Sequence, residues 1–214
     1  MSDSSQATTY SSPPKTISLA MTGASGAAYG LRLLECLLSS DNRVYFMLSQ
    51  PAQVVLGMET DLSLSGGTAE IEKKLTEKFK AKKGQLSVFS RDQWMAPVAS
   101  GSGVPDAMVV CPCTTGTLSS IAHGTSKNLI ERAADVVLKE QKKLILVVRE
   151  TPLSVIHLEN MLSLAKMGAV MLPANPGFYH QPESIDDLVD FVVARILDQL
   201  NIAHQLLPRW GEPA

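Results

Sequence analysis

The stretch ISLAMTGASGAAYG (residues 17–30) runs from a short apolar segment into a glycine-rich turn and the start of a helical pattern. Residues 17–21 have the composition of a buried strand, and apolar residues recur at helix spacing over 27–38. Glycines let the backbone of such a turn approach an anion, and free N–H groups at a helix start favour negative charge. The glycine spacing fits neither G-x-G-x-x-G nor a P-loop. A tight packing turn and an anion-binding turn are therefore equal interpretations of this stretch alone.

The same alternation of strand and helix continues along the chain. Strands are also predicted at 44–48, 86–89, 107–111, 144–148 and 169–173, and helices from about 51 and at 69–83, 128–140, 154–166 and 185–200. Continuous apolar runs indicate strands covered on both faces, and the helices between them require parallel connections. The predicted fold class is α/β: a doubly wound, mostly parallel sheet of the Rossmann or flavodoxin type, in three layers. Ligands of such sheets bind outside the carboxyl ends of the strands.

Composition limits the classes of function. The 214 residues, 45% hydrophobic and 19% charged, suit one globular domain, predicted at 16–212 after a Ser-, Thr- and Pro-rich tail (1–15) that is predicted to be disordered. A net charge of −2 gives no basic surface for nucleic acid, and no apolar run approaches the length of a membrane span. Three cysteines without framework spacing, and no targeting segment, predict a reduced, cytoplasmic protein. The Cys111–Cys113 pair and the scattered histidines form no zinc motif, so no metal is predicted.

Polar residues follow the predicted strands. Ser49 could contact a ligand or cap the next helix, and the cap is the favoured interpretation. The segment CPCTTGTLSS (111–120) opens a helix with a cluster of hydroxyls, which fits an anion or a flavin phosphate. Arg149 and Glu150 directly follow the strand at 144–148, where charge is costly unless it is paired or used. They are interpreted as a phosphate-binding arginine beside an acid/base carboxylate, with an ion pair as the alternative.

Longer motifs resemble one family. The chain contains AMTGASGAAYGLRLLECL (20–37), ETDLSL (59–64), DQWMAPVASGSG (92–103), MVVCPCTTGTLSSIAHG (108–124), NLIERAADVVLKE (128–140), LVVRETPLSVIHLENM (146–161), PANPGFYHQPESIDDLVDFVVARILDQL (173–200) and LPRWGE (207–212). They occur in the order seen in the flavin prenyltransferases of the UbiX/Pad family. The resemblance covers roughly residues 16–212.

The resemblance implies a reaction. Such enzymes bind reduced FMN and dimethylallyl phosphate, attach the dimethylallyl group to flavin N5 and close a ring at C6. The product, prenylated FMN, serves a UbiD-type decarboxylase. Members use no metal and usually form homododecamers with active sites at subunit contacts. Neither nucleic acid nor a membrane is an expected partner.

The resemblance also implies roles for residues at matching positions. Gly23, Ala24 and Ser25 would hold the phosphate side of FMN, and the FMN site would be completed by Ser49, Thr114, Thr115, Gly116, Thr117 and Arg149. The phosphate of dimethylallyl phosphate would meet Ser100, Gly101, Arg132, Lys139, Glu150, Tyr179 and Arg195. Catalytic roles would fall to Glu150, Glu59, Lys139 and Trp94. Many members have Ser where Thr114 stands, and Thr keeps the hydroxyl.

The chemistry of these residue types agrees with the implied reaction. Fixed cations stabilise the charge that grows on a departing phosphate. An aromatic ring such as that of Trp94 stabilises allylic cation character. Closure at C6 leaves a proton, for which Glu150 or the released phosphate is a suitable base.

Each residue also has a local interpretation. Asp135 could pair with Arg132 or Lys139, Arg195 could pair with Asp198, and Trp94 could fill a core or an interface. Two other functions stay open: a flavin-dependent cysteine decarboxylase and a non-catalytic flavin-storage protein. The decarboxylase is disfavoured because PCTTGTL and PANPGFY stand where that family has P-A-S-A-N-T and P-x-M-N-x-x-M-W, and because no histidine precedes His123.

Overall fold

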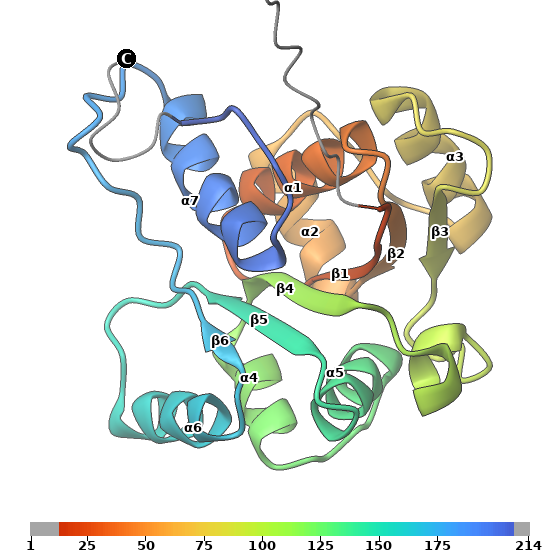
Figure 1. Ribbon diagram of the computed structural model, residues 1–214, viewed down its shortest axis with the longest axis vertical. Helices are drawn as coiled ribbons and strands as arrows, with labels where there is room; N and C mark the ends of the chain where they lie inside the picture. The colour runs from red at the N-terminus through yellow and green to blue at the C-terminus, as the bar shows by residue number, and fades with distance from the viewer. Residues whose placement is uncertain (1–12, 208–214) are drawn as a thin grey trace, which may run out of the picture.

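The computed structural model describes residues 13–207, which contain one six-stranded sheet (Figure 1). The order of the strands is β3-β2-β1-β4-β5-β6, and every neighbouring pair is parallel. Their bounds are Thr16–Met21 (β1), Arg43–Leu48 (β2), Leu86–Phe89 (β3), Ala107–Cys113 (β4), Lys143–Val148 (β5) and Val170–Met171 (β6). This is the Rossmann order, in which the direction of winding reverses between β1 and β4. The predicted doubly wound α/β sheet is confirmed.

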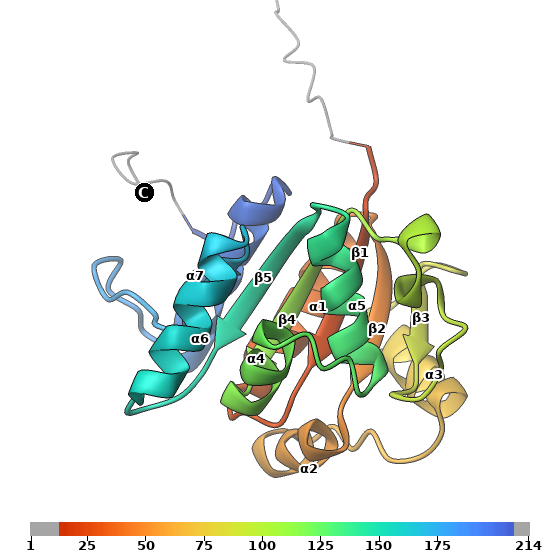
Figure 2. The same cartoon turned by 90° about the horizontal axis from the view of Figure 1, so that it is seen from below.

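Helices cover both faces of the sheet. They are α1 (Ala27–Ser39), α2 (Gln50–Glu59), α3 (Thr68–Phe79), α4 (Thr115–Ala122), α5 (Leu129–Lys139), α6 (Val155–Lys166) and α7 (Ile185–Leu200). Two short 3₁₀ turns, η1 (Pro97–Ala99) and η2 (Gly101–Gly103), precede β4. Helices α1 and α7 lie on one face and α4, α5 and α6 on the other, which confirms the predicted three layers (Figures 1 and 2).

Two cores follow from the alternation of side chains along buried strands. Ile17 and Leu19 of β1 belong to the core beneath α1 and α7. Ala20 of the same strand belongs to the opposite core, together with Ile130 of α5 and Leu164 of α6. Because both faces are covered, the strands are apolar over most of their length, with polar exceptions such as Ser18 in β1 and Ser87 in β3.

Three boundaries differ from the prediction by two residues or more. Helix α3 ends at Phe79 rather than 83, because Lys80 adopts the left-handed conformation with φ of 53°. Strand β4 continues beyond Cys111 to Cys113, with a shift of register between Val110 and Cys113 that accommodates Pro112. Strand β6 is only two residues long, shorter than the predicted 169–173.

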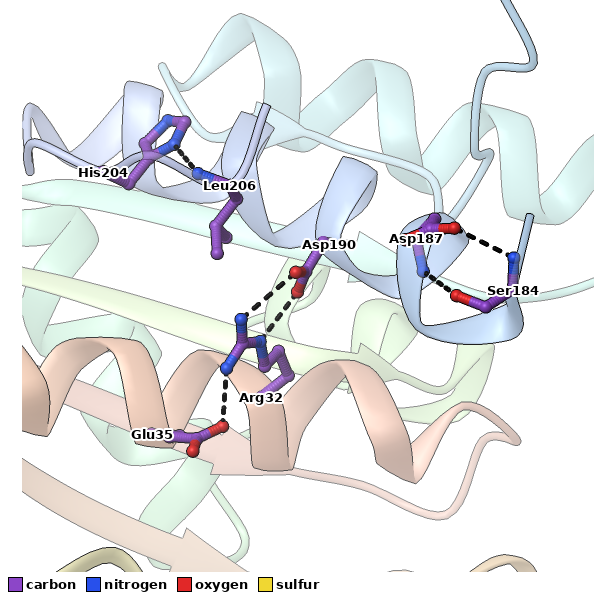
Figure 3. Close-up of polar contacts among 7 residues, drawn as sticks. All are labelled: Arg32, Glu35, Ser184, Asp187, Asp190, His204 and Leu206. Carbon is purple, nitrogen blue, oxygen red and sulfur yellow. Dashed lines mark hydrogen bonds and ion pairs between the residues drawn. The ribbon is translucent and has the colours of Figure 1, made fainter. Parts of the chain in front are cut away.

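Helix α7 is held against α1 by a charged contact (Figure 3). Arg32 Nε donates to Asp190 Oδ1 at 2.7 Å, and Arg32 Nη2 donates to Asp190 Oδ2 at 3.1 Å. Such two-pronged pairs fix orientation as well as distance. Ser184 and Asp187 form a capping box at the start of α7. These contacts fix the helix that carries Arg195.

No helix within residues 13–207 is long and apolar enough to cross a bilayer. The predicted tail lies outside the described residues over 1–12, and so does most of the LPRWGE motif, from 208 onward. The described part of the tail, residues 13–15, leads directly into β1.

Candidate active site

A cavity of about 250 Å³ opens where β1, β2 and β4 end, at the reversal of strand order. Four hydroxyl side chains line it: Thr22, Ser49, Thr114 and Thr117. The remaining lining residues are Gly23, Gln50, Pro51, Arg91, Asn128 and Ile130. Ligands of open parallel sheets bind at this position. The cavity therefore combines residues expected at the FMN site (Gly23, Ser49, Thr114 and Thr117) with others to which the sequence assigned no role in the site.

Two helix starts border the cavity. Ser49 caps α2 by accepting a hydrogen bond from the Ala52 N–H at 3.2 Å, as expected. Thr114 caps α4 by accepting one from the Thr117 N–H at 3.1 Å, and the two threonine hydroxyls lie 2.9 Å apart. Both capping residues also line the cavity, so a cap and a ligand contact are compatible roles. Thr115 and Gly116 lie in the first turn of α4.

Thr22 joins the turns that follow β1 and β4. Its side chain donates to the Pro112 carbonyl at 2.9 Å and accepts from the Thr114 N–H at 2.8 Å. The residue is buried, with 3% of its surface exposed. Its single donor is used, so Thr22 positions the Thr114 cap rather than donating to a ligand. The sequence feature that could have indicated a role for Thr22 is its position as the first polar residue after β1.

The opening turn (22–26) is occupied by a carboxylate of the chain itself. Glu59, at the end of α2, accepts hydrogen bonds from the N–H groups of Gly26 at 2.9 Å and Ala27 at 2.8 Å. From the sequence, free N–H groups at this helix start were expected to bind an external anion. A side chain at Gly23 would collide with Pro51, so that glycine is needed for packing. A Cβ at Gly116, by contrast, would meet only Thr114 Oγ1, at 3.9 Å.

The carboxyl of Glu59 is held in its ionised form. Desolvation raises its pKa, but hydrogen bonds from Ser25, Ala27 and Gly26 and the charge of Arg149 outweigh that effect and lower the pKa overall. Residues from the turn after β1, the end of α2 and the end of β5 therefore interact electrostatically.

Arg149 and Glu150 line a second cavity, of about 340 Å³, at the end of β5. The Glu150 carboxylate accepts from the Thr151 N–H at 3.1 Å. Arg149 is exposed and makes no ion pair within the described part of the chain. The alternative interpretation, an ion pair of Arg149 and Glu150 with each other or with a neighbouring residue, is therefore wrong within the described residues.

Four of the residues expected at the prenyl phosphate lie where α5 meets the η1–η2 segment. Arg132 and Lys139 belong to α5, and Ser100 and Gly101 belong to the η1–η2 segment. Arg132 Nε donates to the Ala99 carbonyl at 3.1 Å, and Arg132 Nη1 pairs with Asp135 Oδ2 at 2.8 Å. Lys139 pairs with Glu140, and a Cβ on Gly101 would lie 3.0 Å from Lys139 Nζ. The Ser100 hydroxyl lies 3.2 Å from that of Ser102.

The remaining expected residues lie elsewhere. Arg195 pairs with Asp198 at 2.6 Å and lines a cavity of about 260 Å³ beside β6. Tyr179 packs edge-on against Phe191, with 5.7 Å between ring centroids, and Trp94 is 47% exposed. One chain therefore holds these cations in separate groups, and the cavity at the strand reversal contains none of Arg132, Lys139 and Arg195.

The two neighbouring cysteines are buried side chains of the core. Burial raises the pKa of both the Cys111 and the Cys113 thiols, which keeps them protonated and unreactive. Within 13–207 no three His, Cys, Asp or Glu side chains gather in a way that could hold a metal ion.

Known proteins resemble this chain over nearly its whole length. The family described as Flavoprotein matches residues 5–197. Flavin prenyltransferase UbiX of Pseudomonas aeruginosa is 60% identical over 201 residues, 94% of this chain and 96% of that protein. The crystal structure of AnUbiX (PadA1) with FMN and dimethylallyl pyrophosphate has a TM-score of 0.83 at 38% identity, covering 94% of this chain and 100% of that one. A dodecameric FMN-dependent UbiX-like decarboxylase from Escherichia coli O157:H7 has a TM-score of 0.82 at 39% identity, covering 92% and 100%.

Proposed function

The chain belongs to the Flavoprotein family and, within it, to the UbiX flavin prenyltransferases, and from this membership we infer its activity. It transfers a dimethylallyl group from dimethylallyl phosphate to N5 and C6 of reduced FMN and releases prenylated FMN. The observation that carries this function is the 60% identity to a flavin prenyltransferase over 94% of the chain. The cavity at the strand reversal provides the site.

The residues at this cavity fit FMN. Hydroxyls such as those of Ser49 and Thr117 suit a ribityl chain and a phosphate, both of which need hydrogen-bond donors. The absence of a side chain at Gly116 leaves open space at the start of α4. Arg149 interacts electrostatically with Glu59, which holds the opening turn, and the ring system would be held on that side. When bound, the reduced flavin supplies the nucleophile for the prenyl group.

We propose that basic side chains of this protein stabilise the phosphate that leaves dimethylallyl phosphate. Arg132, Lys139 and Arg195 would surround the donor phosphate with Ser100, Gly101 and Tyr179, and so stabilise the charge that develops as the C–O bond breaks. Their present partners, Asp135, Glu140 and Asp198, form partly exposed pairs of small energetic value. A dianionic phosphate can therefore replace those partners at little cost.

One chain does not gather these cations, so the proposal includes assembly. We infer that the chain forms a homododecamer, like the E. coli relative described as dodecameric, and that neighbouring copies complete each site. Helix α6 carries exposed apolar residues, including Val155, Ile156 and Leu162, that suit contact with another copy. Trp94, which is half exposed in one chain, would form an aromatic wall beside the prenyl group.

Glu150 is proposed as the base. Closure of the ring leaves a proton to be removed, and the Glu150 carboxylate lies next to Arg149 in the cavity at the end of β5. The product would then pass to a UbiD-type decarboxylase, in the cytoplasm. Glu59, held ionised beside Ser25, would fix the opening turn against the flavin.

A product assay tests the activity. The purified full-length chain is incubated without oxygen with reduced FMN and either dimethylallyl phosphate or the pyrophosphate. The expected result is a flavin heavier by one five-carbon unit. Loss of a carboxyl group from a peptide ending in cysteine, with no prenylated flavin, would instead identify a cysteine decarboxylase.

The Glu150→Gln variant separates an enzyme from a storage protein. We expect it to keep FMN affinity and to slow prenylation, because the amide cannot accept the proton. A matched control is Glu77→Gln, an exposed carboxylate on α3. FMN binding without turnover in the unmodified chain would support storage.

A mixing experiment tests the shared site. Glu150→Gln and Arg195→Gln are each expected to prenylate FMN much more slowly than the unmodified chain when assembled alone. Co-assembly should restore part of the activity if the two residues reach one site from different copies. No recovery would place both residues in the same copy.

A further inference from the structure

We propose that Arg91 is an additional FMN-binding residue that selects the phosphorylated flavin over riboflavin. The inference rests on the proposed function, since it assigns one end of the flavin to one part of the cavity. Arg91 belongs to none of the motifs that indicate the family. It follows β3, and it lines the cavity at the strand reversal.

The charge of this cavity is carried by Arg91. Among the ten lining residues, the others are neutral: hydroxyl side chains, glycine, proline, glutamine, asparagine and isoleucine. No carboxylate lines the cavity. FMN differs from riboflavin only by its phosphate, so the anionic end of the ligand matches the part of the site that holds the cavity's one charged side chain among the described residues.

The neighbouring groups are suited to the same end of the ligand. The cavity lies against the starts of α2 and α4, where the caps Ser49 and Thr114 are found. Helix starts carry partial positive charge that favours an anion. The opening turn, by contrast, is filled by the Glu59 carboxylate, which would repel a phosphate. We therefore place the flavin phosphate toward Arg91 and the ring toward Arg149, and not, as the sequence led us to expect, the phosphate at the opening turn.

The backbone of Arg91 is fixed while its side chain is free to adjust. The Arg91 carbonyl accepts a hydrogen bond from the Leu129 N–H at 2.7 Å, which ties residue 91 to the start of α5. Asn128, the cap of that helix, lines the same cavity. Within the described residues the Arg91 guanidinium forms an ion pair only with Asp92, at 3.4 Å, and both side chains are more than half exposed. Such an exposed ion pair is weak. A phosphate that accepts two parallel hydrogen bonds from the Arg91 guanidinium would displace the Asp92 carboxylate.

The test compares two flavins that differ in the phosphate. Dissociation constants of FMN and riboflavin are measured by quenching of flavin fluorescence for the full chain and for Arg91→Gln. We expect Arg91→Gln to weaken FMN binding about tenfold and to change riboflavin binding by less than about twofold. Arg91→Lys should keep part of the FMN affinity, because it retains the charge and loses the planar fork. FMN binding should also weaken less with added salt in Arg91→Gln than in the unmodified chain.

Lys83→Gln is the matched control, since it removes one positive charge at an exposed position before β3. It should leave both affinities unchanged. Retained riboflavin binding shows in the same measurement that Arg91→Gln is folded. Equal loss of both flavins in Arg91→Gln, or no loss of FMN, would overturn the assignment of Arg91 alone. If the unmodified chain binds no flavin, the proposed function fails with it.

Discussion

Replacement of Thr22 by valine tests how the site is built. Valine keeps the shape of threonine and removes the hydroxyl that joins the turns after β1 and β4. The Pro112 carbonyl still accepts from the Thr22 N–H at 3.1 Å, so only the Thr114 N–H loses its acceptor. A partly buried donor left without a partner costs about 1.5 kcal/mol of unfolding free energy. For a domain of this size the melting temperature should fall by about 3–6 °C.

Thermal and urea unfolding, followed by circular dichroism at one protein concentration, measure this loss. Thr16→Val, at the other end of β1, is the control, because the Thr16 hydroxyl makes no hydrogen bond within the described chain. The control should change stability by less than about 0.5 kcal/mol. Thr22→Val should also weaken FMN binding, because the Thr114 cap is displaced. Equal stability of the two variants would refute the positioning role of Thr22.

Three further predictions concern separate parts of the molecule. Ser49→Ala should lose about 1 kcal/mol of stability and weaken FMN binding, whereas Ser184→Ala, which removes the cap of α7, should lose similar stability with unchanged FMN affinity. Because the folded chain lowers the pKa of Glu59 from its ordinary 4.5, its ionised form contributes stability at higher pH and loses it as pH falls through the lowered value. The stability difference between the unmodified chain and Glu59→Gln, measured by urea unfolding, should be steady above about pH 5 and shrink in acid; a difference that grows in acid would contradict this. Cys111 and Cys113 should resist a thiol reagent at neutral pH until the chain unfolds, and rapid labelling of either by mass spectrometry would disprove their burial.

Local pattern was sufficient to predict the sheet. The run Leu144–Val148 is apolar without alternation because helices cover both faces of β5, and this signal is present in the sequence. The errors occur where single residues override the pattern. Lys80 turns left-handed and ends α3, and Pro112 stays within β4 through a change of register.

The site could be predicted only in part. Ser49 and Thr114 are caps, and a cap is a local feature that follows from residue type and position. Glu59 reaches the opening turn from a position 32 residues away from Ala27, and no local rule indicates such a contact. Arg91 follows the short strand β3 and belongs to no recognised motif. Its position after a strand was nevertheless a feature from which a role in ligand binding could have been predicted.

A crystal structure of the full chain with FMN and dimethylallyl phosphate bound tests the proposed active site most directly. We predict the flavin phosphate between Ser49, Thr117 and Arg91, with the ring beside Arg149. The prenyl phosphate should lie among Arg132, Lys139 and Arg195, contributed by more than one copy. A flavin bound elsewhere, or a prenyl phosphate that touches none of these three cations, would contradict it.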